Sequence, residues 1–400
     1  MYRYSVETWA ESFYTGWMRK ITVYLKLLSC VCLIESALAV PDVAIIEDKA
    51  LAHTAQILPV DAEGKVVGEH IDEQYAKAFT NLSVVLEEVG SSIDQIVRLN
   101  IYTTSNEHLA RIRSLVSKEV KFVETAVVSS VPHKAALVAL DAIAMVSGMD
   151  APVIVRYHTS STFSTQGKMA HVAVLPKGRT LYISGMADPT KDLHKATVGT
   201  MEQLQSVLDL NGVGLEHVVH LKAYMKPMDK VNVARNGMSE LFRDVHAPPM
   251  SFIEWSNPIP IEIELIAFLP GKGKGASPVE LKWRPEEKRS PVYCRFAVLD
   301  SSTRIYTKGY ISQKALDAEG QVRDIYAQLK ASIEPYGSDF RHLVKATYLV
   351  AAQDTSSALN AVRPELYDPE RPPAASKASI TGTGDDKRTI LIDMIAVPKQ

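Results

Sequence analysis

The sequence of 400 residues has few of the features that mark specialised classes of protein. It contains only 3 cysteines, and its 44 basic residues nearly balance its 46 acidic residues, for a formal net charge of -2. This balance provides no electrostatic footprint for a nucleic acid or a membrane surface. Glycine and proline, at 20 and 21 residues, are too sparse for a fibrous or low-complexity chain. The composition is therefore that of an ordinary globular protein. At roughly 100–200 residues per domain, the length allows two to four domains.

The motifs of metal and cofactor chemistry are also missing. The 11 histidines show no spacing with cysteine or carboxylate residues that is typical of a metal site. No glycine-rich phosphate loop precedes a helix, and no Gly-x-Ser-x-Gly nucleophile elbow occurs. We therefore expect no metal, no cofactor, no nucleic-acid partner and no membrane partner.

Residues 1–39 have the pattern of a processing signal with an upstream extension. Arg19-Lys20 precede an apolar run at 27–34, and Ala37-Leu38-Ala39 is the small-x-small pattern that signal peptidase cleaves. The run is well below the roughly 20 residues of a spanning helix. We expect a mature start near Val40 and a periplasmic or secreted protein. A buried helix of the fold and a lipid-anchored cysteine are the alternatives.

The rest of the chain repeats one pattern three times. In each copy an apolar helical stripe leads to a glycine, and the glycine leads to a run typical of a strand. Gly90, Gly212 and Gly337 lie about 120 positions apart, the size of a domain rather than of a stacking repeat. Each glycine fits the left-handed position past the end of a helix. The stripes are Tyr75, Phe79, Leu82 and Leu86 in the first copy, and Met201, Leu204 and Leu208 in the second.

A second shared block closes each copy. It is a strand with an acidic residue two positions before an isoleucine, and the acids are Asp141, Glu264 and Asp393. Each copy then predicts an N-terminal hairpin, a helix, a strand, a second helix and a closing pair of strands, which is an α+β arrangement. The predicted domains are 40–148, 153–270 and 291–400, with a Gly-, Pro- and charge-rich linker at 271–290.

These blocks resemble the RidA/YjgF family, also known as endoribonuclease L-PSP or reactive intermediate deaminase. The resemblance covers essentially the whole chain after residue 39. Its most telling pieces are Leu181–Met186 and the stretch from Pro248-Pro249 to Ile261–Ala267, which is similar to the family's PARS and IEIEAIA sequences. It implies a chorismate-mutase-like fold whose single-domain chains form trimers, with ligand pockets between subunits. Three RidA-like domains in one chain then suggest a monomeric, intramolecular pseudo-trimer.

The resemblance also implies a site. Family members hydrolyse 2-imino acids to keto acids and ammonia, with an arginine of PARS holding the substrate carboxylate and a glutamate of IEIEAIA placing a water. A planar guanidinium suits that task because it pairs with a carboxylate through two hydrogen bonds. No copy has arginine at the matching position: Met250 stands there in the second copy, Ala375 in the third, and Val123 or Glu124 in the first. The glutamate matches Glu262 in the second copy, whereas Ala139 and Leu391 replace it in the others.

Glu262, His171 and Ser184 are the predicted catalytic residues, and they would serve as a general acid/base group if they converge. Ser184-Gly185 match a pocket-lining pair of the family, for which the first copy has Thr54-Ala55. The predicted ligand-binding residues are Gly185, Met250, Arg295 and Lys308. Simpler interpretations stay open: Glu262 as an outward strand residue, His171 as a surface-loop histidine, and the two cations as solvated side chains.

Two functions follow from these residues. The first is an exported, diverged hydrolase or deaminase that acts on a small imine, enamine or carbonyl compound at an inter-domain cleft. Because the three copies differ, at most one cleft is expected to be active. The second is a non-catalytic protein that binds a small molecule in the same clefts.

Overall fold

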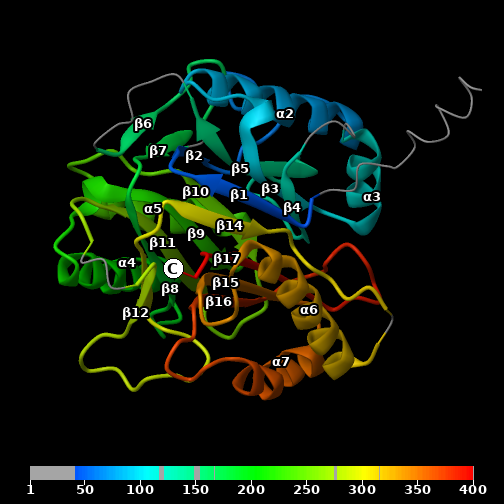
Figure 1. Ribbon diagram of the computed structural model, residues 1–400. Helices are drawn as coiled ribbons and strands as arrows, with labels where there is room; N and C mark the ends of the chain where they lie inside the picture. Colours follow the sequence, from blue (N-terminus) through cyan, green and yellow to red (C-terminus); the bar gives the residue numbers. More distant parts are fainter. Residues whose placement is uncertain are drawn as a thin grey trace, which may run out of the picture. The chain divides into compact units, whose positions relative to one another are not determined.

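The computed structural model describes residues 41–116, 121–147, 154–165, 167–273, 277–314 and 316–399. They belong to one compact unit, Pro41–Gln400, that contains three β-sheets and the helices that pack on them (Figure 1). The predicted signal segment lies outside the described residues. Within these ranges, no helix combines the length and the apolar character needed to cross a membrane.

The elements follow a similar order in three successive segments of the chain. The first has β1 (Val43–Glu47), β2 (Ala50–Thr54), α2 (Ile71–Glu87), β3 (Ile96–Thr103), α3 (Asn106–Leu115), β4 (Val123–Val128) and β5 (Val138–Val146). The second has β6 (Arg156–His158), β7 (Val172–Leu175), β8 (Arg179–Met186), α4 (Leu193–Leu210), β9 (Val218–Met225), α5 (Val231–Leu241), β10 (Met250–Glu254) and β11 (Ile261–Leu269). The third has β12 (Val279–Lys282), β13 (Phe296–Leu299), β14 (Thr303–Thr307), α6 (Ala318–Ile333), β15 (Leu343–Val350), α7 (Gln353–Leu366), β16 (Ala374–Ser379) and β17 (Ile390–Ala396). Short 3-10 turns occur at Ile93–Gln95, Leu215–His217, Met228–Lys230 and Glu334–Tyr336.

The predicted helix, glycine and strand are confirmed in each segment. Gly90, Gly212 and Gly337 have φ values of 80°, 68° and 72°, in the left-handed region that glycine adopts without steric cost. They lie between α2 and β3, between α4 and β9, and between α6 and β15. The predicted stripes face the core, although Phe79 is only half-buried.

Each sheet contains four strands of one segment in the same order: β4-β3-β5-β2, β10-β9-β11-β8 and β16-β15-β17-β14. Strands of another segment extend each sheet, at its β2, β8 or β14 side. β7 and β6 extend the first sheet, β13 and β12 extend the second, and β1 extends the third. The third sheet therefore joins the beginning of the described chain to its end, with Val43 opposite Thr307 and Glu47 opposite Thr303. Figure 1 shows β1, in blue, beside β14, in yellow.

The predicted N-terminal hairpins are wrong. β7 and β8 follow each other in the chain, but β7 pairs with β2 whereas β8 pairs with β11 and β13. β1 and β2 are separated in the same way, as are β13 and β14. An unpaired edge strand exposes backbone donors and acceptors, and here the first strand of each pair covers an edge of a different sheet. The segment 271–290, predicted as a linker, contains strand β12.

The strands present two different faces. On β3, Leu99 and Ile101 pack in a cluster with residues of α2 and α3, whereas Arg98 and Asn100 alternate with them and point away from the helices. A further buried cluster combines residues of all three sheets, including Val97, Val219 and Val344. The three sheets therefore meet on their helix-free faces, and this places strands of different segments side by side.

Candidate functional site

The seven predicted site residues are distributed over three places where strands of two segments meet. We call them the Glu262 junction (β8 and β11 against β13 and β16), the His171 junction (β2 and β5 against β7 and β10) and the Lys308 junction (β14 and β17 against β1 and β4). The first contains Glu262, Ser184, Gly185 and Arg295, the second His171 and Met250, and the third Lys308. His171 therefore does not join Glu262 and Ser184, and the expected trio does not form.

Glu262 is the second residue of β11, and its carboxyl group packs directly over Gly185 of β8, where a Cβ atom would collide with it. Its side chain is half-buried rather than solvated. Burial raises the pKa of Glu262 to about 7, and the neighbouring carboxylate of Glu264 adds to the rise. A carboxyl group with a pKa near neutrality can both accept and return a proton.

Ser184 connects the two sides of the Glu262 junction. Its Oγ donates to the carbonyl oxygen of Cys294 at 2.6 Å and accepts from the N–H of Ala375 at 2.7 Å. Because its hydroxyl proton is already used, Ser184 is suited to holding the junction together rather than to attacking a substrate. Burial raises the pKa of the Cys294 thiol to about 12, which leaves that side chain unreactive.

Arg295 lies at the same junction, but its charge is already neutralised. Its Nε donates to both oxygens of Glu287, at 2.9 and 3.0 Å, and its Nη1 makes a long contact of 3.4 Å with the carbonyl oxygen of Gly185. The guanidinium positive charge is thus shared with a carboxylate of the protein. Arg295 is a weak candidate for binding an anionic ligand.

Lys377 is a residue of the Glu262 junction that the sequence analysis missed. It follows Ala375 by two positions on β16, so both residues face the same side of the strand. Its ammonium group donates to two neutral partners on α7, the hydroxyl of Ser356 at 3.2 Å and the amide oxygen of Asn360 at 3.1 Å. Burial lowers the pKa of Lys377, while the nearby charge of Glu262 opposes this effect. The two-residue period of a strand, applied to Ala375-Ser376-Lys377, is the signal that could have identified it.

His171 is not a surface-loop histidine, because it is only 2% exposed. Its Nδ1 accepts a hydrogen bond from the N–H of Ser160 at 3.0 Å, and its ring lies 4.1 Å from the ring of Phe163. Burial lowers the pKa of His171 to about 4, so that the ring is neutral at pH 7. It lines a cavity of only about 10 Å³ together with Met250.

The His171 junction is filled by a glutamine side chain. The pair that occupies the place of Ser184-Gly185 here is Ala55-Gln56, one residue beyond the predicted Thr54-Ala55. This alignment follows from comparing the register of β2 against β5 with that of β8 against β11. The N–H of Ala55 donates to the carbonyl of His171 at 2.7 Å. The Gln56 amide exchanges two hydrogen bonds with the backbone of Phe252, at 3.1 and 3.0 Å. A small ligand would have to displace this buried amide and break both of its hydrogen bonds to Phe252.

The Lys308 junction lacks a carboxylate over its glycine. Leu391 packs against Gly309, at the place where Glu262 covers Gly185 in the other junction. The Lys308 ammonium forms an ion pair with Asp42 at 2.6 Å, so its charge is also neutralised. Among the described residues, no group of three or more His, Cys, Asp or Glu side chains is arranged to hold a metal ion.

The fold and the site define a class of α+β protein in which a half-buried carboxyl group, with a pKa near neutrality, lies where the strands of two segments meet. Residues 37–146 match the family described as Endoribonuclease L-PSP. A RutC family protein of Pyrococcus abyssi is 31% identical over 91 residues, which cover 22% of this chain and 72% of that protein. The chain belongs to the RidA/YjgF family.

Two solved structures also match parts of this chain. A YjgF family member of Neisseria meningitidis has 18% identity and a TM-score of 0.24, and the match covers 30% of this chain and 96% of that one. Yeast Mmf1 has 20% identity and a TM-score of 0.22, with 24% of this chain and 80% of that one covered.

Proposed function

We propose that the Glu262 junction binds a small imine or enamine and hydrolyses it to a carbonyl compound and ammonia. The observation that carries the proposal is the Glu262 carboxyl group, which packs over Gly185 with a pKa raised to about 7. Membership of the RidA/YjgF family supports a small-molecule role. A general acid/base that works near neutral pH is what hydrolysis of a carbon–nitrogen double bond requires.

The proposed reaction consumes one water and needs no cofactor. In the first step the carboxylate of Glu262 removes a proton from a water, the water oxygen bonds to the carbon of the protonated imine, and the electron pair of the carbon–nitrogen double bond moves to the nitrogen. The resulting amino alcohol then collapses. Protonated Glu262 returns its proton to the nitrogen, the carbon–nitrogen bond breaks to release ammonia, the carbon–oxygen double bond forms, and the hydroxyl proton passes to the departing ammonia. One group serves as base and then as acid because its pKa lies near the working pH.

Lys377 is proposed to attract an acidic substrate in place of the missing arginine. An ammonium group is a point charge, whereas a guanidinium matches both oxygens of a carboxylate. We therefore expect weaker and less selective binding of 2-imino acids than an arginine would give. This difference favours small imines whose carboxylate contributes only part of the binding energy.

We also infer that three RidA-like domains form an intramolecular pseudo-trimer with a single active junction. The cyclic donation of β7, β13 and β1 to neighbouring sheets supports the arrangement. The Gln56 amide at the His171 junction and Leu391 at the Lys308 junction support the restriction of activity to the Glu262 junction. Export stays part of the proposal and rests on residues 1–39 alone.

The test is release of ammonia from 2-iminopropanoate generated in situ. Purified protein should release ammonia faster than buffer, and Glu262→Gln should remove most of that increase. The exposed Glu202 of α4 offers a matched control, since Glu202→Gln changes the same chemistry away from the junction. A Glu262→Gln variant as active as the control would exclude the proposed role.

Binding without catalysis is the second candidate, and one observation favours it. The expected catalytic trio does not form, because His171 lies at another junction and the Ser184 hydroxyl already donates to the carbonyl of Cys294. A thermal-shift screen of small carboxylates and aldehydes tests this function. Binding alone is supported if ligands raise the melting temperature of a protein that releases no ammonia, and it fails if none does.

A further inference from the structure

A groove of about 530 Å³ lies beside helix α5, away from the Glu262 junction. It runs between one side of α5, the segment 242–247 that leads to β10, and Gly167-Lys168. No described residue of its wall belongs to the Glu262 junction. The volume is within the range of small-molecule sites, about 300–1,000 Å³, so the groove has room for a small ligand.

The charged side chains of this groove are mainly basic. Lys168, Arg235 and Arg243 line it. His246 adds an imidazole ring that can donate a hydrogen bond, and Glu240 is the one acid among the described residues of the wall. Three cations against one acid leave a surplus of two positive charges, and a concave surface with such a surplus attracts anions.

Arg235 is the buried member of this group. It is 3% exposed, lines both the groove and the small cavity beside His171, and lies with its guanidinium carbon 5.3 Å from the centre of the Phe252 ring. Its Nη1 donates to the neutral amide oxygen of Asn232 at 2.5 Å, and its Nε has no partner among the described residues. Burial lowers the pKa of Arg235 to about 10, so the guanidinium is still charged at pH 7. A buried charge without an acidic partner is costly, and an aromatic ring offsets only part of that cost.

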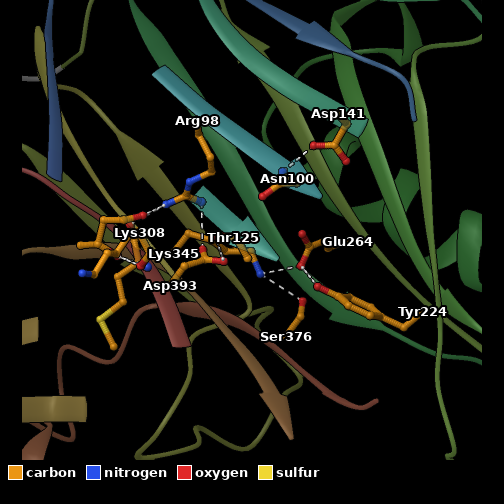
Figure 2. Close-up of polar contacts among 12 residues, drawn as sticks. Arg98, Asn100, Thr125, Asp141, Tyr224, Glu264, Lys308, Lys345, Ser376 and Asp393 are labelled. Atoms are coloured by element: carbon orange, nitrogen blue, oxygen red, sulfur yellow. Dashed lines mark hydrogen bonds and ion pairs between the residues drawn. The ribbon is translucent and has the colours of Figure 1, made fainter. Parts of the chain in front are cut away.

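A cavity of about 50 Å³ where the three sheets meet shows the opposite situation, because its cations are matched. Figure 2 shows an ion pair of Arg98 with Asp393 at 2.9 Å. It also shows an ion pair of Lys345 with Glu264 at 2.7 Å. Arg235 makes no such ion pair with any residue that the structure describes, which leaves its counter-charge to come from outside the chain. The described acids and cations of the central cavity are Asp141, Glu264 and Asp393, and Arg98, Lys222 and Lys345.

The two exposed cations of the groove are available to act together with Arg235. Lys168 makes no hydrogen bond or ion pair with any residue that the structure describes. Gly167 packs against the stem of Arg235, where a Cβ atom would collide with it, so Lys168 lies at the same end of the groove. Arg243 donates to a backbone carbonyl, that of Glu240, at 3.2 Å, and forms no ion pair with a described residue.

We propose that this groove binds a phosphoryl dianion, as inorganic phosphate or as the phosphate of a small phosphomonoester, held by Arg235 and Lys168. A phosphate monoester carries a charge of about −1.5 to −2 at pH 7, which matches the surplus of two positive charges better than a carboxylate does. A guanidinium also presents a fork of donors to two phosphate oxygens. The space beside Phe242 and Val245 accommodates the rest of an ester. The site is independent of the Glu262 junction, so one proposal can fail without the other.

The experiment is isothermal titration calorimetry with inorganic phosphate and with glycerol 3-phosphate, at pH 7.5 and constant ionic strength. Wild-type protein should bind at least one of the two probes saturably, at one site per chain. Arg235→Met and Lys168→Met should each raise the dissociation constant roughly tenfold or more, because each removes a hydrogen bond to a charged group. Lys195→Met, which removes an exposed lysine of α4, should leave it unchanged.

The two probes separate the possible sources of the ligand. Binding of inorganic phosphate identifies a phosphate site, binding of the ester alone identifies a phosphomonoester site, and either supports the proposal. It is overturned if neither probe binds saturably, or if Arg235→Met binds as tightly as the wild type. If Arg235→Met does not fold, Lys168→Met decides, because Lys168 is exposed and its replacement should not disturb the fold. An unchanged dissociation constant in Lys168→Met then excludes the site.

Discussion

The carboxylate of Glu262 lies against the Cα atom of Gly185 with no room for a side chain between them. This contact joins β11 to β8 and puts the proposed acid/base group beside the third segment. Neither residue identifies the site by its type alone. Their packing is what gives the carboxyl group a defined position and a raised pKa.

Replacing Gly185 by alanine should therefore displace the Glu262 carboxylate. Its φ value does not require glycine, so the backbone should tolerate the change. We expect ammonia release to fall roughly 10- to 100-fold, as for other small misplacements of catalytic groups. Steady-state kinetics would measure the loss. Gly309→Ala is the matched control, because it crowds Leu391 instead of a carboxylate; equal activity of the two variants would contradict the prediction.

The raised pKa of Glu262 predicts a pH-dependent stability difference. The folded protein holds this proton up to about pH 7, whereas the unfolded chain releases it near its usual value of 4.5. Ionisation thus disfavours the folded state, and the penalty grows as the pH rises from about 4.5 to 7 and is complete above it. Glu262→Gln should raise the melting temperature relative to wild type at pH 8 and much less at pH 5. An equal difference at both pH values would show that the pKa is not raised.

The buried ion pair between Arg98 and Asp393 predicts strong coupling. Both side chains are 7% exposed, and Arg98 also donates to the carbonyls of Thr307 and Met394. Arg98→Met should lower the free energy of unfolding by about 3–5 kcal/mol, because it leaves Asp393 buried and unpaired. The double variant with Asp393→Leu should lose less than the sum of the single losses. Chemical denaturation measures the free energy of unfolding of each variant. If the loss in the double variant equals the sum of the two single losses, the side chains are not coupled.

Strand β1 closes the third sheet, which predicts its effect on assembly. The intact chain should have the mass of one chain in solution. Deleting residues 43–47 should uncover the edge of β14, and an uncovered edge pairs readily with another chain. Light scattering would detect the expected dimers or larger species. A trimer of the intact chain, or a monomeric deletion variant, would contradict this prediction.

Local patterns were sufficient for most of the secondary structure. The helical stripes and the glycines at Gly90, Gly212 and Gly337 depend on neighbours in the chain, so they could be recognised without coordinates. The strands that pair with one another in the sheets could not be recognised in this way. Strands β7 and β8 look like a hairpin because they are adjacent in sequence, yet each finds a longer-range partner.

The sequence by itself determined the α+β class, the acids that close each segment and the resemblance that the family match confirms. Only the tertiary structure decided that His171 belongs to another junction, that Gln56 rather than Ala55 faces Phe252, and that Lys377 lies near Glu262. It also brought Lys222 and Lys345 to the wall of one cavity. The physical reason is that charge balance, burial and packing depend on residues more than 100 positions apart, such as Arg98 and Asp393, separated by 295. A local sequence pattern cannot show a contact between residues that far apart in the chain.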